Sequence, residues 1–181
     1  TDLFLICLFC PRSWKKWFLV KFSPTLIESF QSAYHEHHST ETALIRVMND
    51  LLVNADSNKV TLLSMLDLSS AFDTIDHEIL LTRLQSVFGI SGTCLGWFCS
   101  YLSDRHQSVV VGGVKSTESV LRFGVPQGSV LGPVLFSMYM HPLGNIISKS
   151  KLSYHFYADD SQIYQSCNVT ELPELVECTE T

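Results

Sequence analysis

The stretch that most constrains this chain is Phe156–Asp160, Phe-Tyr-Ala-Asp-Asp, in which two adjacent carboxylates lie between two apolar runs. Alternating apolar residues precede it, and Ile163 and Tyr164 follow it, so the pattern predicts a strand, a tight turn and a second strand. The aspartates fall in the turn, where their mutual repulsion is unfavourable unless a cation lies between them. A hard divalent ion such as Mg2+ would balance that charge. An ordinary Asp-Asp-Ser turn without a ligand fits the same residues.

The chain has 181 residues, the size of one domain or of one large piece of a longer protein. It begins at Thr1 rather than at Met, which suggests a fragment. Hydrophobic residues make up 46% and charged residues 17%, so the chain has enough apolar material to form a core. The formal net charge of -6 argues against a large phosphate-binding surface, because Lys and Arg supply most of the affinity for nucleic acids.

The six cysteines are scattered along the chain, and only Cys7 and Cys10 have the spacing of a metal-binding pair. We interpret them as reduced thiols of an intracellular, not a secreted, protein. The apolar run Leu3–Cys10 is too short to span a bilayer and lacks the flanks of a secretory signal, so we expect no membrane association.

Apolar residues at helical spacing predict three helices, at about 40–54, 77–88 and 93–102. Ser39 or Thr40 can cap the first of these, and Asp76 can cap the second. In the second helix the residues expected to face inward are Ile79, Leu80, Leu84 and Val87. A hairpin is expected within 107–123, because a pair of glycines separates two short β-type runs there.

The apolar run Val60–Leu68 predicts a strand buried on both faces. Asp67 lies near its carboxyl end, where a carboxylate either caps the next turn or binds something. The Gly- and Pro-bounded loop Gly124–Ser129 feeds an apolar segment, Val130–Met140, and Pro133 suits the first turn of a helix there.

Two strands that end in acids would bring Asp67 close to Asp159 and Asp160 if they were neighbours in one sheet. Three carboxylates in such a place could hold two cations about 3.5–4 Å apart, the arrangement used for in-line phosphoryl transfer. One ion would lower the pKa of an attacking hydroxyl, and the other would stabilise a leaving pyrophosphate.

Four motifs in this order resemble the reverse transcriptase of non-LTR (LINE-type) retrotransposons. They are Gln-Ser-Ala-Tyr followed by His-Ser-Thr-Glu-Thr-Ala-Leu at 31–44, Leu-Asp-Leu-Ser-Ser-Ala-Phe-Asp-Thr-Ile-Asp-His at 66–77, Gly-Val-Pro-Gln-Gly-Ser-Val-Leu-Gly-Pro at 124–133 and Tyr-Ala-Asp-Asp at 157–160. Each motif alone is weakly specific, but all four together are highly specific.

The resemblance implies an α+β right-hand polymerase: an antiparallel palm sheet with packed helices, part of the fingers, and no thumb. It implies that Asp67 and Asp159 bridge two Mg2+ ions, for which Mn2+ could substitute, and that Asp160 supports them. Residues implied to contact nucleotide or template are Phe72, Gln127, Gly128, Tyr157 and Ala158. The expected partners are an RNA template, a DNA primer and deoxynucleoside triphosphates, in the nucleus or the cytoplasm.

The resemblance also suggests a division of the chain at residues 29 and 167. Residues 30–167 would be the fingers and palm, and residues 168–181 a short acidic tail of a truncated palm. Residues 1–29 diverge from the family, and we hypothesise that 8–27 are a frameshift remnant. His35 stands where the family usually has Arg.

Two interpretations therefore stand beside each other: an RNA-directed DNA polymerase, and a decayed retroelement product that folds without catalysis. An unrelated Asp-dependent phosphatase or hydrolase would need a nucleophile pattern that is not evident around Asp67.

Overall fold

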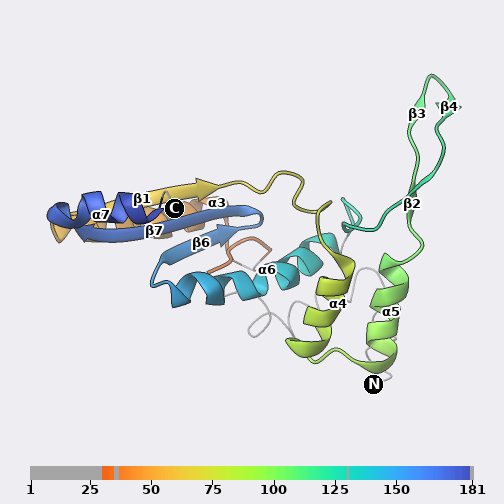
Figure 1. Ribbon diagram of the computed structural model, residues 1–181, viewed down its shortest axis with the longest axis horizontal. Helices are drawn as coiled ribbons and strands as arrows, with labels where there is room; N and C mark the ends of the chain where they lie inside the picture. Colours follow the sequence, from red (N-terminus) through yellow and green to blue (C-terminus); the bar gives the residue numbers. More distant parts are fainter. Residues whose placement is uncertain (1–29, 35–36, 130, 180–181) are drawn as a thin grey trace. The chain divides into compact units, whose positions relative to one another are not determined.

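The computed structural model of the chain describes residues 30–34, 37–129 and 131–179. These residues group into two compact units (Figure 1). The middle unit comprises residues 70–139, and the sheet unit comprises residues 30–69 and 140–179. The N-terminal segment 1–29, to which the frameshift hypothesis applies, lies outside the described residues. Within the described ranges, no helix has both the length and the apolar character needed to cross a membrane.

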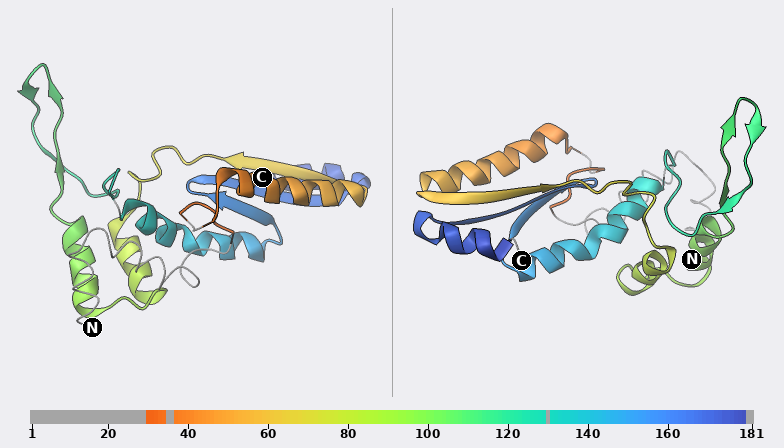
Figure 2. Two further views of the ribbon diagram at one scale, coloured as in Figure 1. Left: turned by 180° about the vertical axis from the view of Figure 1, so that it is seen from behind. Right: turned by 45° about the horizontal axis from the view of Figure 1, so that its top comes forward.

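The sheet unit is built on three antiparallel strands in the order β1-β7-β6. The strands are β1 (Lys59–Leu66), β6 (Ser153–Tyr157) and β7 (Asp160–Asn168). Figure 2 shows α3 (Thr40–Asp56) along one face of the sheet, and α7 (Leu172–Thr179) with the last turns of α6 (Gly132–Lys149) on the other. A single 3-10 turn, η1 (Val169–Glu171), joins β7 to α7. The expected hairpin is confirmed, because a two-residue turn connects β6 to β7.

Alternate side chains of the central hairpin pack against different helices, as the two-residue period of a strand requires. Tyr154 and Phe156 of β6 form a buried cluster with Ile147 of α6. Tyr164 of β7 faces the other way, and its hydroxyl donates a hydrogen bond to the Asp50 carboxylate of α3. Helices on both faces therefore hold the hairpin that carries the paired aspartates.

Strand β1 is an edge strand, which corrects the prediction of a strand buried on both faces. Among the described residues it pairs with β7 alone, and none of its residues is buried. Met65 is 76% exposed and Leu66 is 51% exposed. The prediction was wrong because an unbroken apolar run shows that a strand can be covered, whereas only the tertiary structure shows which faces are covered.

Helix α3 begins where its cap residues predict. The Ser39 hydroxyl accepts a hydrogen bond from Thr42 N at 3.2 Å, and Thr42 Oγ1 accepts one from Ser39 N at 2.8 Å, which completes a capping box. The buried residues of its apolar stripe are Ala43 and Val47, whereas Leu44, Met48 and Leu52 are exposed. Within the described residues, α3 thus packs with only part of the stripe that its sequence predicts.

In the middle unit, α4 (His77–Ser86) packs beside α5 (Gly92–Leu102). The predicted cap of α4 is confirmed: Asp76 Oδ1 accepts hydrogen bonds from Glu78 N at 2.8 Å and Ile79 N at 3.0 Å. Leu80 and Leu84 are fully buried, but Ile79 and Val87 are exposed, which corrects their expected inward orientation. The helix also ends two residues earlier than predicted, at Ser86.

Residues 106–120 form a narrow two-stranded arm, which confirms the predicted hairpin. Its strands are β2 (His106–Gln107), β3 (Val110–Val111), β4 (Val114–Lys115) and β5 (Ser119–Val120). β2 pairs with β5 and β3 with β4. Gly112 and Gly113 form the turn with φ of 57° and 82°, values that glycine adopts without strain.

The loop after the arm is bound to the chain that follows Ser70. Gly124 N donates to Ile75 O at 2.8 Å, and Val125 N donates to Phe72 O at 2.8 Å. Gly124 has a φ of +84°, and a Cβ at this position would lie 2.8 Å from Asp73 Cα. Position 124 therefore requires glycine both for its backbone conformation and for the close approach of another backbone.

Two side chains also bind the carbonyl oxygen of Gly124. His77 Nε2 donates to it at 2.7 Å and Arg105 Nη1 donates to it at 3.1 Å. The start of α4, the start of the arm and the loop before α6 are thereby cross-linked at one peptide group.

Helix α6 is longer than the apolar segment that predicted it. It extends from Gly132 to Lys149, with Pro133 in its first turn as expected and with Pro142 inside it. Ser129 Oγ accepts a hydrogen bond from Gly132 N at 2.9 Å at its start. Its last turns pack Ile147 and Leu143 against β6, so tertiary contacts stabilise helix beyond the proline.

We expect Gly124→Ala to destabilise the protein more than Gly89→Ala. Both glycines have positive φ, but nothing lies within 4 Å of a Cβ built on Gly89. The Gly89 variant should lose about 1–2 kcal/mol through its left-handed backbone alone, and the Gly124 variant should lose more because it also clashes with Asp73. Urea unfolding measures both values, and equal losses would contradict the close approach.

His155 is the buried titratable group closest in sequence to the aspartate turn. It is 1% exposed, and its Nε2 lies 2.9 Å from Ser32 Oγ. Burial lowers its pKa from the ordinary value, the positive charges of Arg46 and His38 lower it further, and Asp50 partly offsets them. The folded state therefore favours neutral His155.

The free energy of unfolding should consequently fall as the pH falls below about 6.5, the ordinary histidine pKa. Below that value the unfolded chain takes up a proton at His155 that the folded chain resists, whereas above it both states hold the residue neutral. The measurement is urea unfolding from pH 7.5 to pH 5.5 for the wild type and for His155→Gln. An identical pH dependence in both proteins would contradict this assignment.

Candidate active site

The turn between β6 and β7 carries the paired aspartates. Tyr157 and Asp160 form its last strand pair, so Ala158 and Asp159 are the two turn residues. Of these two, Ala158 has a positive φ, 57°, which is uncommon for a residue with a Cβ. Asp159 is half-buried and Asp160 is exposed.

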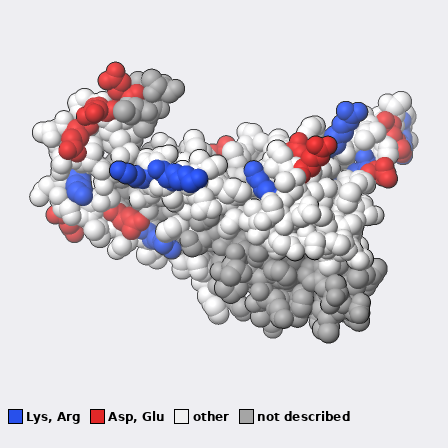
Figure 3. Space-filling view, turned by 60° about the horizontal axis from the view of Figure 1, so that its bottom comes forward, with Lys and Arg blue, Asp and Glu red and all other residues white. Residues whose placement is uncertain are grey.

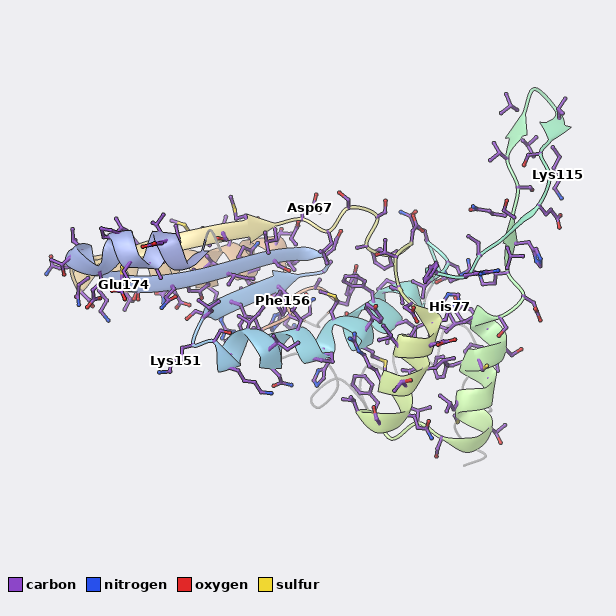
Figure 4. The ribbon with its side chains drawn as sticks, viewed as in Figure 1. Asp67, His77, Lys115, Lys151, Phe156 and Glu174 are labelled. Carbon is purple, nitrogen blue, oxygen red and sulfur yellow. The ribbon has the colours of Figure 1, made fainter. Side chains whose placement is uncertain are left out.

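Asp67 reaches the same end of the sheet from β1. Leu66 pairs with Ser161, so Asp67 leaves β1 next to Asp160, the first residue of β7. Figure 4 shows Asp67 at the end of β1, beside the tip of the β6–β7 hairpin. The two strands that end in acids, β1 and β6, are not neighbours as expected, because β7 lies between them; Asp67 is instead placed beside the first residue of β7.

The three carboxylates have oxygens available for a hard cation. Within the described residues, none of the three accepts a hydrogen bond or joins an ion pair. Carboxylate oxygens are the ligands that Mg2+ prefers, so the donor set fits such an ion. Across the same residues, however, no three His, Cys, Asp or Glu side chains are grouped closely enough to hold a metal ion. The strands bring the backbones of the acids together, and the side chains do not form a closed ligand cluster.

A short segment, residues 30–34, lies next to the end of β6 and contacts the turn. It runs parallel to the end of β6: Phe156 N donates to Phe30 O at 2.8 Å, and Ser32 N donates to Phe156 O at 2.9 Å. Gln31 lies beside Ala158 and is 3% exposed. Sequence reasoning missed Gln31 as a site residue, because nothing in a polar Gln-Ser pair indicates that it is buried.

Tyr34 is a second neighbour of the turn that sequence reasoning missed. Partial burial raises the pKa of its hydroxyl, and the negative charge of Asp159 and the Tyr157 side chain raise it further. Tyr34 has a φ of +66°, which is uncommon for an aromatic residue. Its hydroxyl therefore stays protonated and can donate a hydrogen bond at neutral pH.

The other predicted residues, Phe72, Gln127 and Gly128, belong to the middle unit. Phe72 is half-buried, and its ring centroid lies 5.0 Å from that of Phe136. Gln127 and Gly128 are exposed in the loop before α6, where Gly128 has a φ of +76°. Their placement against the aspartates stays a prediction.

Gln127 lines a cavity of about 620 Å3 that lies wholly within the middle unit. Its charged lining residues are Arg105, Arg122 and Asp73. Two guanidinium groups against one carboxylate make the lining suitable for an anionic ligand. On the face drawn in Figure 3, by contrast, Lys and Arg side chains occur among Asp and Glu side chains.

A family model described as "Reverse transcriptase (RNA-dependent DNA polymerase)" matches residues 16–181. A probable RNA-directed DNA polymerase from transposon BS of Drosophila melanogaster is 30% identical over 148 residues, which are 79% of this chain and 16% of that protein. The RNA-directed DNA polymerase from the mobile element jockey of the same organism is 31% identical, over 76% of this chain and 15% of that protein. The chain thus spans about a sixth of the length of these curated relatives.

The fold of this chain is similar to that of a solved structure. The apo telomerase of Candida tropicalis, truncated from its C-terminal domain, matches with a TM-score of 0.65 at 15% identity, over 97% of this chain and 37% of that one. At this identity the match bears on the fold alone, and it agrees with the α+β right-hand polymerase architecture expected from the motifs. Reverse transcriptases generally use divalent metal ions, in keeping with the carboxylates at the end of the sheet. With a family match that extends over 16–181 and relatives at 30% identity or more, this chain belongs to the reverse transcriptase family.

Proposed function

We propose that this chain is a fingers and palm portion of an RNA-directed DNA polymerase from a non-LTR retrotransposon. It would join deoxynucleoside triphosphates to the 3′-hydroxyl of a DNA primer on an RNA template, in the nucleus or the cytoplasm. The observation that carries this proposal is the pairing of Leu66 with Ser161. It brings Asp67 beside Asp160, at the end of the sheet where Asp159 forms the turn. The relatives' names supply the reaction.

Asp67 and Asp159 are the proposed ligands of two Mg2+ ions, with Asp160 as a supporting carboxylate and Mn2+ as a substitute. When bound, such ions lower the pKa of an attacking hydroxyl and stabilise the charge on the leaving pyrophosphate. The protein contributes the placement of the ligand backbones. Asp159 is one of the two turn residues between β6 and β7, and Asp67 directly follows Leu66, the last paired residue of β1, so the strand pairing limits how far either backbone can shift.

Phe72 is the proposed sugar-selecting residue. Its contact with the Phe136 ring keeps its own ring in place, and a fixed aromatic ring can exclude a 2′-hydroxyl by direct contact. On the sheet unit, Tyr157 and Ala158 are proposed to contact the nucleotide, because they precede Asp159 in the same turn.

Gln127 and Gly128 are proposed to contact the template or the nucleotide. The cavity beside Gln127 supports this role, because Arg105 and Arg122 in its lining carry the charge that attracts phosphate groups. Nothing lies within 4 Å of a Cβ built on Gly128, so the space beside this residue is open to a ligand.

Primer extension on an oligonucleotide-primed RNA template with Mg2+ tests this function. We expect extension by the wild type and a loss of at least about a hundredfold in Asp159→Ala, because metal ions contribute several kcal/mol of charge stabilisation in the transition state. Asp56→Ala removes an exposed carboxylate at the end of α3 in the same unit and should keep wild-type activity.

Absence of extension by the folded wild type would refute the polymerase function for this chain. In that case Mg2+ could still raise the melting temperature of the wild type and not that of Asp159→Ala. That pair of results would identify the alternative, a decayed palm that keeps its ion site without catalysis.

A further inference from the structure

We propose that Gln31 is a positioning residue that holds the Ala158 peptide group in its left-handed conformation and so determines where Asp159 lies. The role of Gln31 in the turn follows from contacts within the sheet unit. The effect of Gln31 on metal binding rests on the proposed function of Asp159.

The Gln31 side chain binds both polar groups of the Ala158 backbone. Gln31 Nε2 donates to Ala158 O at 3.1 Å, and Ala158 N donates to Gln31 Oε1 at 2.9 Å. Oε1 also accepts a hydrogen bond from Ala33 N at 3.0 Å. The two bonds to Ala158 join positions 127 residues apart in the chain, and Gln31 is 3% exposed, so water does not compete freely for them.

Ala158 needs such support because of its backbone conformation. Its φ of +57° is a left-handed value, which is unfavourable by roughly 1–2 kcal/mol for a residue with a Cβ. The residue is also partly buried, so its N–H and C=O need partners. A carboxamide carries a donor and an acceptor side by side, and the Gln31 amide therefore pairs with both groups of one residue.

Gln31 is itself held in place by the sheet. Its neighbours exchange backbone hydrogen bonds with Phe156: Phe156 N donates to Phe30 O at 2.8 Å and Ser32 N donates to Phe156 O at 2.9 Å. Ser32 Oγ lies 2.9 Å from the buried His155 Nε2. The backbone of Gln31 is thus fixed to β6 at Phe156, two residues before Ala158 in the chain.

The position of Asp159 depends on the backbone of Ala158. Asp159 follows Ala158 directly, and its own carboxylate has no hydrogen-bond partner among the described residues. Its placement therefore depends on the turn backbone. A reactive group that is displaced by about 1 Å can lose a hundredfold in rate, so a residue that fixes this backbone acts on the chemistry without touching substrate.

Hydrogen exchange of the Ala158 amide, followed in the metal-free protein, tests the contact directly. Gln31→Met keeps the length of the side chain and removes both hydrogen bonds to Ala158, together with the one from Ala33 N, and it should accelerate exchange of the Ala158 amide about tenfold or more. Gln165→Met makes the same chemical change on β7 away from the turn and should leave exchange of the Ala158 amide as in the wild type. Unchanged exchange in folded Gln31→Met would overturn the proposal.

A second substitution separates positioning from general loss of packing. Gly accepts positive φ without strain. We expect Gln31→Met to weaken Mn2+ binding, and adding Ala158→Gly to that variant should restore much of the lost affinity. A variant that had only lost packing at position 31 would not be rescued by this change. If Gln31→Met does not fold, Gln31→Asn takes its place, because its amide is one methylene short of Ala158.

Mn2+ binding, measured by electron paramagnetic resonance, tests whether the loss of the Gln31 contacts weakens metal binding at the aspartates. We expect about tenfold weaker binding in Gln31→Met than in Gln165→Met. If the wild type binds no Mn2+, the proposed function fails, and the exchange rate of the Ala158 amide alone decides the role of Gln31. If the wild type binds Mn2+ and Gln31→Met binds it equally well, the positioning role is overturned while the proposed function stands.

Discussion

The antiparallel register of β1, β7 and β6 is the constraint on which the candidate site depends. Leu66 pairs with Ser161 and Tyr157 pairs with Asp160, so the acid after β1 and the acids of the hairpin turn meet at one end of the sheet. A slip of one residue would turn every side chain of a strand to the opposite face. Packing on both faces opposes such a slip, through the apolar cluster with Ile147 and the Tyr164 hydrogen bond to Asp50.

Both units stabilise an unusual loop backbone with side chains that are distant in sequence. In the sheet unit, the left-handed Ala158 is held by the amide of Gln31. In the middle unit, the carbonyl oxygen of Gly124 accepts hydrogen bonds from His77 and Arg105. Gly124 adopts its positive φ without strain, whereas Ala158 does not, and backbone strain such as that of Ala158 persists only where surrounding groups determine it, often at functional sites. Each of these loops carries one of the motifs that identify the family.

Local interactions explain which predictions were correct. Ser39 and Asp76 cap their helices as expected, and Gly112 and Gly113 form the predicted turn, because each needs only residues within a few positions along the chain. The errors concern burial: β1 is an edge strand, and Ile79 and Val87 face solvent. A hydrophobic period defines a face of an element, but the neighbours that cover this face come from elsewhere in the chain.

The amino-acid sequence by itself determined the family, the hairpin around Asp159 and Asp160, and the acid that follows β1, because short motifs and strand periods are local properties. Only the tertiary structure decided that β1 pairs with β7 and that Gln31 is buried against Ala158. These contacts join residues about 100 or more positions apart. Their partners are chosen by the packing of the whole sheet unit, which no local pattern encodes.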